Sequence, residues 1–158
     1  MKTACMKSPV GLLEIKFNEE EVTSIFFVEE SEAADKPNKI FRECKKQLTE
    51  YFKGERRTFD FPFRQTGSAF QKKVWNELAK IPFGKTISYL QLAKGIGDVK
   101  AIRAAASANG KNKLPIVVPC HRVIGSDGTL VGYAGGLSRK QFLLEHEAKF
   151  ASGVQKLF

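Results

Sequence analysis

Two short runs of aliphatic and aromatic residues, at positions 10–17 and 22–28, open the chain. Each has the length of a β-strand, and the polar stretch at 18–21 between them has the composition of a turn. The pattern predicts an antiparallel hairpin. The residues before position 10 give no such signal, and we expect the terminus around Cys5 to be frayed.

An amphipathic helix is predicted next, because Phe41, Cys44, Leu48 and Phe52 recur at intervals of three or four residues. Gly54 follows as a signal for the end of the helix. The spacing places Cys44 on the apolar face, and we interpret it as a small core residue.

The pattern changes at an aromatic run that Pro62 and Gly67 interrupt. Short helices replace the strands beyond it. We therefore expect an N-terminal α/β domain at residues 1–62 and a second domain at residues 63–158.

Three short helices are predicted at 70–81, 88–94 and 99–108. In the second we expect Leu90 to point inward, and Asp98 is well suited to cap the third. The second and third helices, joined through a glycine turn, have the shape of a helix-turn-helix.

Residues 101–108 of the third helix are unusually rich in alanine, and Arg103 is the one long polar side chain among them. This segment has almost none of the polar tips that read base edges in the major groove. Small side chains let a backbone approach a surface closely, which favours sequence-independent contact with nucleic acid. A plain buried helix fits the same pattern, and this segment alone leaves both interpretations open.

Residues 116–118 are predicted to form a short apolar strand. The turn at 125–128 is predicted to fold residues 129–133 back as a hairpin. A last helix is predicted to open at Ser138, with Gln141 three residues on as a capping box. Its predicted apolar stripe consists of Leu143, Leu144 and Ala148.

Charge is distributed unevenly. The chain has 26 Lys and Arg against 17 Asp and Glu, a net charge of +9. Residues 1–60 hold 11 basic and 12 acidic residues, whereas residues 61–158 hold 15 and 5, a net charge of +10. A basic half joined to a neutral half suggests a surface for a polyanion, most commonly nucleic acid. A solvated basic face is the alternative.

The three cysteines, Cys5, Cys44 and Cys120, form no C-x-x-C pair. Neither a disulfide framework nor a thiolate metal site is indicated, which favours a reduced, intracellular setting. No segment has the apolar length of a membrane span, and the start lacks the apolar core of a signal peptide. We expect a soluble cytoplasmic protein.

Cys120 is the candidate nucleophile, because a thiol becomes reactive when a base or a positive neighbour lowers its pKa. His121 and Arg122 follow it directly, although neighbours in an extended strand point to opposite faces. A Cys-His pair is also common as plain structure. Pro115 and Pro119 favour the functional interpretation, since they hold the segment stiffly.

Glu147 is the candidate partner of His121. It falls at the edge of the apolar face of the last helix, where a carboxylate needs a partner. An acid that orients an imidazole is the arrangement of a nucleophile activation system. Glu145 and Glu147 could equally be solvated, and spacing does not decide.

Residues 119–123, Pro-Cys-His-Arg-Val, are the active-site signature of the O6-alkylguanine-DNA alkyltransferases, also called methylated-DNA–protein-cysteine methyltransferases. The chain resembles this family over about residues 70–147. Further matches, in order and correctly spaced, are Phe70-Gln71, Val74-Trp75, Ile81-Pro82, Gly84, Thr86, Ser88-Tyr89, Leu92-Ala93, Arg103-Ala104, Ala108-Asn109, Asn112, Pro115-Ile116, Gly132-Tyr133, Gly135-Gly136, Lys140, Leu143-Leu144 and Glu147.

The resemblance implies an α/β (α+β) fold. A small ribonuclease-H-like N-terminal domain, with an antiparallel sheet and a helix, would precede a mainly helical, winged-helix-like C-terminal domain. It also implies stoichiometric DNA repair, in which Cys120 takes the alkyl group from O6-alkylguanine after the nucleotide is flipped out. O4-alkylthymine is a further candidate substrate. His121 would be the base acting through water, Glu147 the acid that orients it, and Asn112 a tie within the active-site turn.

The DNA contacts also follow from the resemblance. Arg103 would fill the vacated stack, Tyr89 would help to rotate the nucleotide out, and small residues such as Ala104 and Ser107 would allow close approach to the minor groove. The other base-pocket and DNA-binding residues would be Val123, Tyr133, Ala134, Gly135 and Lys140. Candidate phosphate contacts are Lys72, Lys73, Lys100, Lys111 and Arg139.

The implied partner is double-stranded DNA containing O6-alkylguanine, bound by a monomer with no cofactor and no membrane contact. We expect no metal, because the N-terminal part has no histidine. Lys113 and Val99 depart from the family pattern, which often has proline at both positions. Two alternatives are a helix-turn-helix protein that binds lesions or regulates transcription without transfer, and a cysteine hydrolase.

Overall fold

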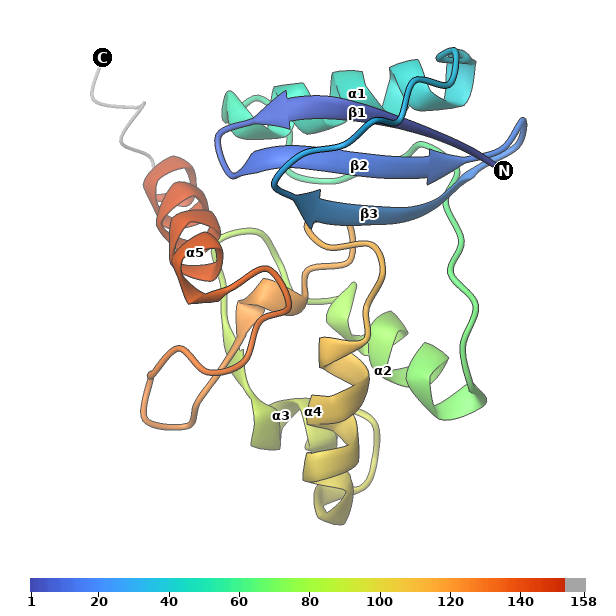
Figure 1. The fold of residues 1–158 in the computed structure, drawn as a ribbon. Helices are drawn as coiled ribbons and strands as arrows, with labels where there is room; N and C mark the ends of the chain where they lie inside the picture. The colour runs from blue at the N-terminus through green and yellow to red at the C-terminus, as the bar shows by residue number, and fades with distance from the viewer. Residues whose placement is uncertain (153–158) are drawn as a thin grey trace. The chain divides into compact units, whose positions relative to one another are not determined.

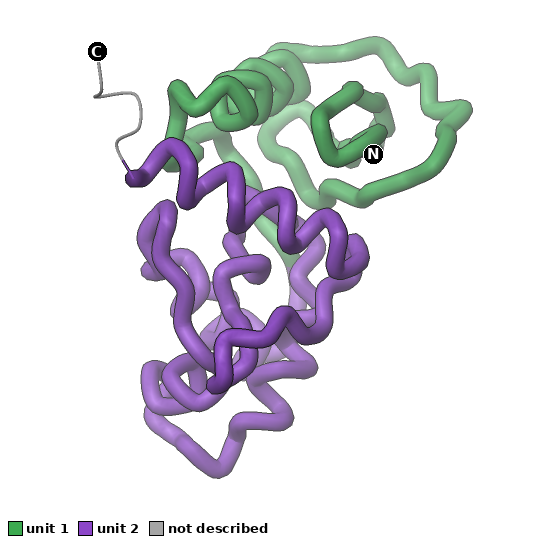
Figure 2. The backbone as a smooth tube through the Cα atoms, turned by 90° about the vertical axis from the view of Figure 1, so that its left-hand side faces the viewer, with its two compact units in different colours: residues 1–65 green, residues 66–158 purple. Residues whose placement is uncertain are grey.

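The computed structural model describes residues 1–152 (Figure 1). The chain forms two compact units, Met1–Gln65 and Thr66–Phe158 (Figure 2). The division falls three residues after the expected boundary at 62. Within residues 1–152, no helix combines the length and the apolarity that crossing a membrane requires.

The N-terminal unit is built on an antiparallel sheet with the strand order β1-β2-β3. Its strands are β1 (Lys2–Ser8), β2 (Gly11–Phe17) and β3 (Val22–Val28). Buried and partly exposed side chains alternate along β2, as expected for a sheet with one covered face. The predicted hairpin is confirmed as β2 and β3.

The expectation of a frayed start is wrong. β1 pairs with β2 along its whole length, from Lys2 opposite Phe17 to Ser8 opposite Gly11. The strand buries only two side chains, those of Ala4 and Met6. So short an alternation gives little signal in the sequence, and the pairing with β2 is what orders the segment.

Helix α1 (Lys39–Phe52) covers one face of this sheet (Figure 1). Asn38 caps its start, since Oδ1 accepts from the amide of Phe41 at 2.9 Å. Gly54 follows the helix with φ +78°, a conformation that favours glycine. Cys44 is fully buried, and burial raises the pKa of its thiol to about 12. The prediction of a core cysteine is confirmed, and this thiol is unreactive at neutral pH.

The C-terminal unit is mainly helical and contains the predicted helix-turn-helix. Its first helices are α2 (Ala69–Leu78), α3 (Tyr89–Gly95), the 3₁₀-helix η1 (Val99–Ala101) and α4 (Ile102–Gly110). Capping boxes at Ser68 and Ser88 begin α2 and α3, and Asp98 caps η1. The indole of Trp75 donates to the carbonyl of Ala108 at 2.9 Å, which ties α2 to α4.

Leu90 is 37% exposed, so its predicted inward position is wrong. Leu92 and Ala93 of the same helix are fully buried. α3 has only seven residues and packs against α2 and α4. Positions 92 and 93 take its covered face, and Leu90, in the first turn of the helix, stays partly in solvent.

Residues 116–118 form a turn, and the predicted strand is wrong. The amide of Val118 donates to the carbonyl of Leu114 at 2.8 Å. Ile116 has φ +74°, a strained conformation for a β-branched residue. Pro115 and Pro119 lack the amide hydrogens that a strand would use, so the segment curls back on itself.

The turn at 125–128 forms as predicted, with the amide of Gly128 donating to the carbonyl of Gly125 at 2.9 Å. The predicted hairpin beyond it is wrong, because residues 129–133 contain no strand. β5 (Val123–Ile124) pairs in parallel with β4 (Ile87–Ser88) instead. Its partner is distant in sequence, which local turn signals cannot indicate.

Helix α5 (Leu137–Ala151) begins one residue before Ser138, so the predicted capping box is wrong. Gly136 is the residue before the helix, and no side chain caps it. Leu143 is buried as predicted, whereas Ala148 of the predicted apolar stripe is exposed. The rest of the buried face is polar and consists of Lys140, His146 and Glu147.

Candidate active site

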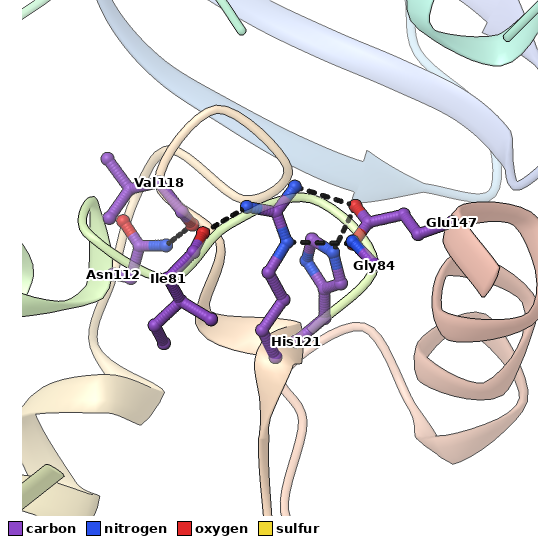
Figure 3. A network of polar contacts seen from close by, with 7 residues as sticks. Ile81, Gly84, Asn112, Val118, His121 and Glu147 are labelled. Carbon is purple, nitrogen blue, oxygen red and sulfur yellow. Dashed lines mark hydrogen bonds and ion pairs between the residues drawn. The ribbon is translucent and has the colours of Figure 1, made fainter. Parts of the chain in front are cut away.

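Cys120 begins the 3₁₀-helix η2 (Cys120–Arg122), directly after the strained turn. It is 6% exposed, and its amide donates to the carbonyl of Val118 at 2.8 Å. Asn112 Nδ2 donates to the same carbonyl at 2.7 Å (Figure 3). Its Oδ1 accepts from the amide of Leu114 at 3.0 Å. Asn112 thus ties together both ends of the turn that presents the thiol.

His121 and Glu147 meet although they are 26 residues apart. His121 Nε2 lies 2.7 Å from Glu147 Oε2, and both side chains are buried (Figure 3). Among residues 1–152, no group hydrogen-bonds to the other ring nitrogen, Nδ1. Glu145 is exposed, so Glu147 is the carboxylate that the fold brings to the histidine.

Arg122 is the site residue that sequence reasoning missed. Its Nε donates to Oε1 of Glu147 at 2.7 Å and its Nη2 to Oε2 at 2.9 Å, a bidentate pair. Its Nη1 donates to the carbonyl of Ile81 at 2.6 Å. The sequence showed Arg122 only as a positive neighbour of Cys120. A buried guanidinium needs a carboxylate partner, but the sequence around Arg122 does not indicate which carboxylate that is.

The Cys120 thiol is protonated at rest. Burial raises its pKa, while a hydrogen bond from Asn112 and the positive charge of Lys140 act in the opposite direction without outweighing burial. A thiol in this state needs a base to take its proton during reaction.

His121 is neutral in the folded protein, because burial lowers its pKa and the neighbouring Glu147 only partly offsets this effect. Burial alone would raise the pKa of Glu147, but His121 and Arg122 outweigh it and hold that pKa well below its usual range. The ionised carboxylate accepts the Nε2 hydrogen. Nδ1 therefore carries the lone pair and is the nitrogen able to accept a proton.

Acid is expected to destabilise the fold first through His121. The unfolded chain takes up a proton near the ordinary pKa of 6.5, whereas the folded chain does so only at lower pH. Stability is therefore fully present above pH 6.5 and falls as the pH drops towards the folded pKa, by at most about 1.4 kcal/mol per pH unit. Glu147 extends this loss of stability to pH values below 4.5, the ordinary pKa of a glutamate, because its pKa in the folded protein is lowered.

Denaturant unfolding between about pH 7.5 and about pH 5 measures this effect. The control is His121→Asn, which retains the buried His146 and should show a smaller slope in that range. Equal slopes in the two proteins would contradict the assignment to His121.

Lys140, expected to contact DNA, is fully buried on α5. Its Nζ donates to the carbonyls of Val123, Val131 and Gly132 at 2.6, 2.8 and 3.3 Å. The expectation of a direct DNA contact is therefore corrected, because these carbonyls hold the ammonium. Lys140 ties the loop after β5 to α5 and places a positive charge near Cys120.

Two of the predicted tyrosines lie close enough to Cys120 to be influenced by its charge. Tyr89 begins α3, and its hydroxyl donates to the carbonyl of Val131 at 3.1 Å. The Tyr133 hydroxyl is buried. Burial raises the pKa of both tyrosines, and ionisation of the nearby Cys120 thiol raises it further. Both hydroxyls therefore stay protonated and are able to donate hydrogen bonds.

The three other predicted pocket residues differ in exposure. Val123 is fully buried in β5, Ala134 is exposed and Gly135 is half-buried. The carbonyl of Gly135 accepts from Nη1 of Arg139 at 3.0 Å, which holds the loop to the first turn of α5. Ala134 and Gly135 offer surface to a ligand, and Val123 supports the site from the core.

Helix α4 has two distinct faces. Arg103, Ala104 and Ser107 are exposed, whereas Ala105 and Ala108 are buried. A plain buried helix is thus excluded. The exposed side is flat because of its small residues, and Arg103 extends from it.

The described side chains supply a thiol and a neutral base, with an ionised carboxylate behind the base. Within residues 1–152, no cluster of three or more His, Cys, Asp or Glu side chains could hold a metal ion. The arrangement is suited to nucleophilic attack by sulfur.

Two family models match the chain. Residues 1–65 match the ribonuclease-like domain of the 6-O-methylguanine DNA methyltransferases. Residues 69–149 match the DNA binding domain of the same proteins.

Similar proteins agree with this match. The methylated-DNA–protein-cysteine methyltransferase of Methanosarcina acetivorans is 42% identical over 153 residues, covering 93% of this chain and 98% of that protein. The constitutive methylated-DNA–protein-cysteine methyltransferase of Bacillus subtilis is 44% identical over 153 residues, covering 89% and 92%. The crystal structure of Mycobacterium tuberculosis OGT in complex with DNA has a TM-score of 0.87 and 39% identity, covering 95% of this chain and 94% of that one.

The fold and the site define a helix-turn-helix protein with a buried cysteine, histidine and glutamate at its centre. The chain belongs to the 6-O-methylguanine DNA methyltransferase family. The family resemblance and the expected fold class are both confirmed.

Proposed function

We propose that this protein is a methylated-DNA–protein-cysteine methyltransferase, which repairs DNA by moving an alkyl group from O6 of guanine to Sγ of Cys120. The observation that carries the proposal is a buried thiol followed directly by a neutral histidine whose Nε2 is held by Glu147. Relatives that bear this enzyme name support it, as does the relative described in complex with DNA.

In the transfer, the thiol proton moves to Nδ1 of His121 through a water molecule as Sγ attacks the alkyl carbon. The S–C bond forms, the C–O6 bond breaks, and its electron pair goes to guanine. The proton on His121 then passes to N1 of the guanine, so the base and the histidine both end neutral. A thioether does not release its alkyl group, so each chain acts once.

Arg122 and Glu147 set the proton affinity of His121. The guanidinium keeps the carboxylate ionised, so Glu147 stabilises the imidazolium that forms without taking its proton. Asn112 and Lys140 favour the thiolate, since both lower the pKa of Cys120.

The target lies inside a stacked duplex, so the nucleotide must be extruded at a cost of a few kcal/mol. Arg103 extends from the exposed face of α4 and would fill the vacated stack, while Tyr89 would help to turn the nucleotide. Ala104 and Ser107 leave that face flat enough for close approach to a groove. We infer that a monomer binds the duplex. Exposed lysines add sequence-independent affinity, namely Lys72, Lys73, Lys100 and Lys111.

Arg103→Ala is expected to slow repair of duplex DNA about 10-fold or more, while leaving the reaction with the free alkylated base unchanged, because only the duplex reaction needs extrusion. Single-turnover rates on both substrates measure this. Lys111→Ala, which removes an exposed charge next to the same helix, is the control and should weaken duplex binding with a normal rate at saturation. If Arg103→Ala lost the same rate on both substrates, Arg103 would not be the residue that fills the vacated stack.

The test of the proposed function is incubation with an oligonucleotide duplex that carries O6-methylguanine, followed by digestion and mass spectrometry. The Cys120 peptide should gain one methyl group, with one lesion repaired per chain. An unmodified Cys120 peptide and an intact lesion would instead support a protein that binds lesions without transfer. Repeated turnover on an ester or a peptide would support a cysteine hydrolase.

A further inference from the structure

The turn at residues 82–85, between α2 and β4, lies against the network around Glu147. The amide of Lys85 donates to the carbonyl of Pro82 at 3.0 Å. Gly84, at the third position, has φ +81°, the geometry of a type II turn, which favours glycine there. The sequence match singled out Gly84 without giving it a role.

The turn and the residue before it contribute three groups to this network, and Figure 3 shows those of Ile81 and Gly84. The carbonyl of Ile81 accepts from Arg122 at 2.6 Å. The ring of Phe83 lies 5.8 Å from the guanidinium carbon of Arg122, within range of a cation–π contact. The amide of Gly84 donates to Oε1 of Glu147 at 3.5 Å. The turn thus contacts both members of the ion pair that orients His121.

Gly84 also sets how closely the turn approaches α5. A Cβ at this position would overlap the Cβ of Ala151 and would lie 3.6 Å from the carbonyl oxygen of Glu147. Ala151 is one helical turn after Glu147. Because packed helices move as units, a side chain at position 84 would push away the part of α5 that carries the carboxylate.

We propose that Gly84 is a positioning residue for alkyl transfer: its missing Cβ and its amide hold Glu147 where His121 and Arg122 both reach it. The inference rests on the proposed function, in which Glu147 orients the base. It gives Gly84 two separate tasks, a close approach to Ala151 and a hydrogen bond to the carboxylate.

The test uses Gly84→Ala, Ala151→Gly and the double variant, with single-turnover transfer from an O6-methylguanine duplex measured against pH. Gly84→Ala should slow transfer about 10- to 100-fold, since small misplacements of a catalytic group have effects of this size. The double variant should recover part of the rate, because the second substitution removes the atom that the new side chain meets, whereas the strain of alanine at φ +81° remains. Ala151→Gly alone should resemble the wild type.

The pH profile separates positioning from a general loss of folding. Glu147 raises the pKa of His121, whereas Arg122 and Lys140 lower it. Moving the carboxylate away should therefore shift the acid limb of the profile to lower pH in Gly84→Ala and return it in part in the double variant. A loss of folded protein would reduce the amplitude of the reaction and leave the limb in place.

Three outcomes would overturn the inference: a normal rate in Gly84→Ala, a slow rate with an unmoved acid limb, or a slow rate that Ala151→Gly does not raise at all. If the wild-type protein failed to alkylate Cys120, the proposed function itself would be wrong. The two failures are therefore distinguishable.

Discussion

Replacing Arg122 with methionine is expected to lower the free energy of unfolding by about 3–5 kcal/mol, the usual cost of breaking a buried ion pair. The guanidinium makes two hydrogen bonds to Glu147 and one to the carbonyl of Ile81. Methionine fills similar volume but satisfies none of them. It leaves an ionised carboxylate and a carbonyl buried without their strongest donor. Denaturant unfolding at neutral pH measures the change.

Two further variants separate charge from geometry. Arg122→Lys keeps the charge but loses the planar fork, so an intermediate loss is expected. Arg122→Met combined with Glu147→Leu removes both charges and should regain much of the stability lost in the single variant. It should remain inactive in transfer, because His121 then lacks its carboxylate. A single variant within about 1 kcal/mol of the wild type would contradict a buried pair of this strength.

Glu147→Gln is expected to slow alkyl transfer about 100- to 10,000-fold, the range for loss of general base assistance, while duplex binding stays close to normal. The amide is uncharged, so it no longer stabilises a proton on His121, and its NH₂ group meets Arg122, which is itself a donor. The proposed DNA-binding face of α4 is a separate surface with the exposed residues Arg103, Ala104 and Ser107. Single-turnover rates and binding titrations on the same duplex measure the two effects.

Glu145→Gln is the matched control for this prediction. Glu145 lies two residues earlier on α5 and is exposed. Within the described residues, its carboxylate accepts a hydrogen bond only from Nε2 of Gln141, at 3.2 Å. Its replacement should change neither transfer nor binding measurably. If duplex binding by Glu147→Gln fell in parallel with transfer, the carboxylate would maintain the fold of the C-terminal unit. Its proposed role in orienting His121 would then be wrong.

Local patterns predicted the elements that local forces specify. The hairpin of β2 and β3, the helix that buries Cys44 and the helix-turn-helix all have an apolar period that matches their structure. The predictions failed where pairing with another strand or a turn between two prolines decides the conformation. β1 is ordered by pairing with β2, β5 pairs with β4 instead of folding back, and Ile116 adopts a left-handed conformation within a turn fixed by Asn112.

The candidate site divides in the same way. The signature around Cys120 identified the nucleophile and its neighbouring histidine as candidates, because both are consecutive in the chain. The spacing did not decide between Glu145 and Glu147 as the partner of His121. Only the folded position of α5 selected Glu147. The resemblance implied that Lys140 belongs to the pocket and DNA-binding residues, whereas the structure buries it against three carbonyls.

The sequence by itself determined the family, the candidate nucleophile and the concentration of positive charge in the second half of the chain. These properties reside in residue identity and in short-range order. Only the tertiary structure decided that Arg122 holds Glu147, that Lys140 serves the loop beside the thiol, and that Gly84 contacts the carboxylate. Electrostatic and hydrogen-bonding partners are fixed by distance in space. The residues concerned are up to 63 positions apart, so no periodicity along the chain records which of them meet.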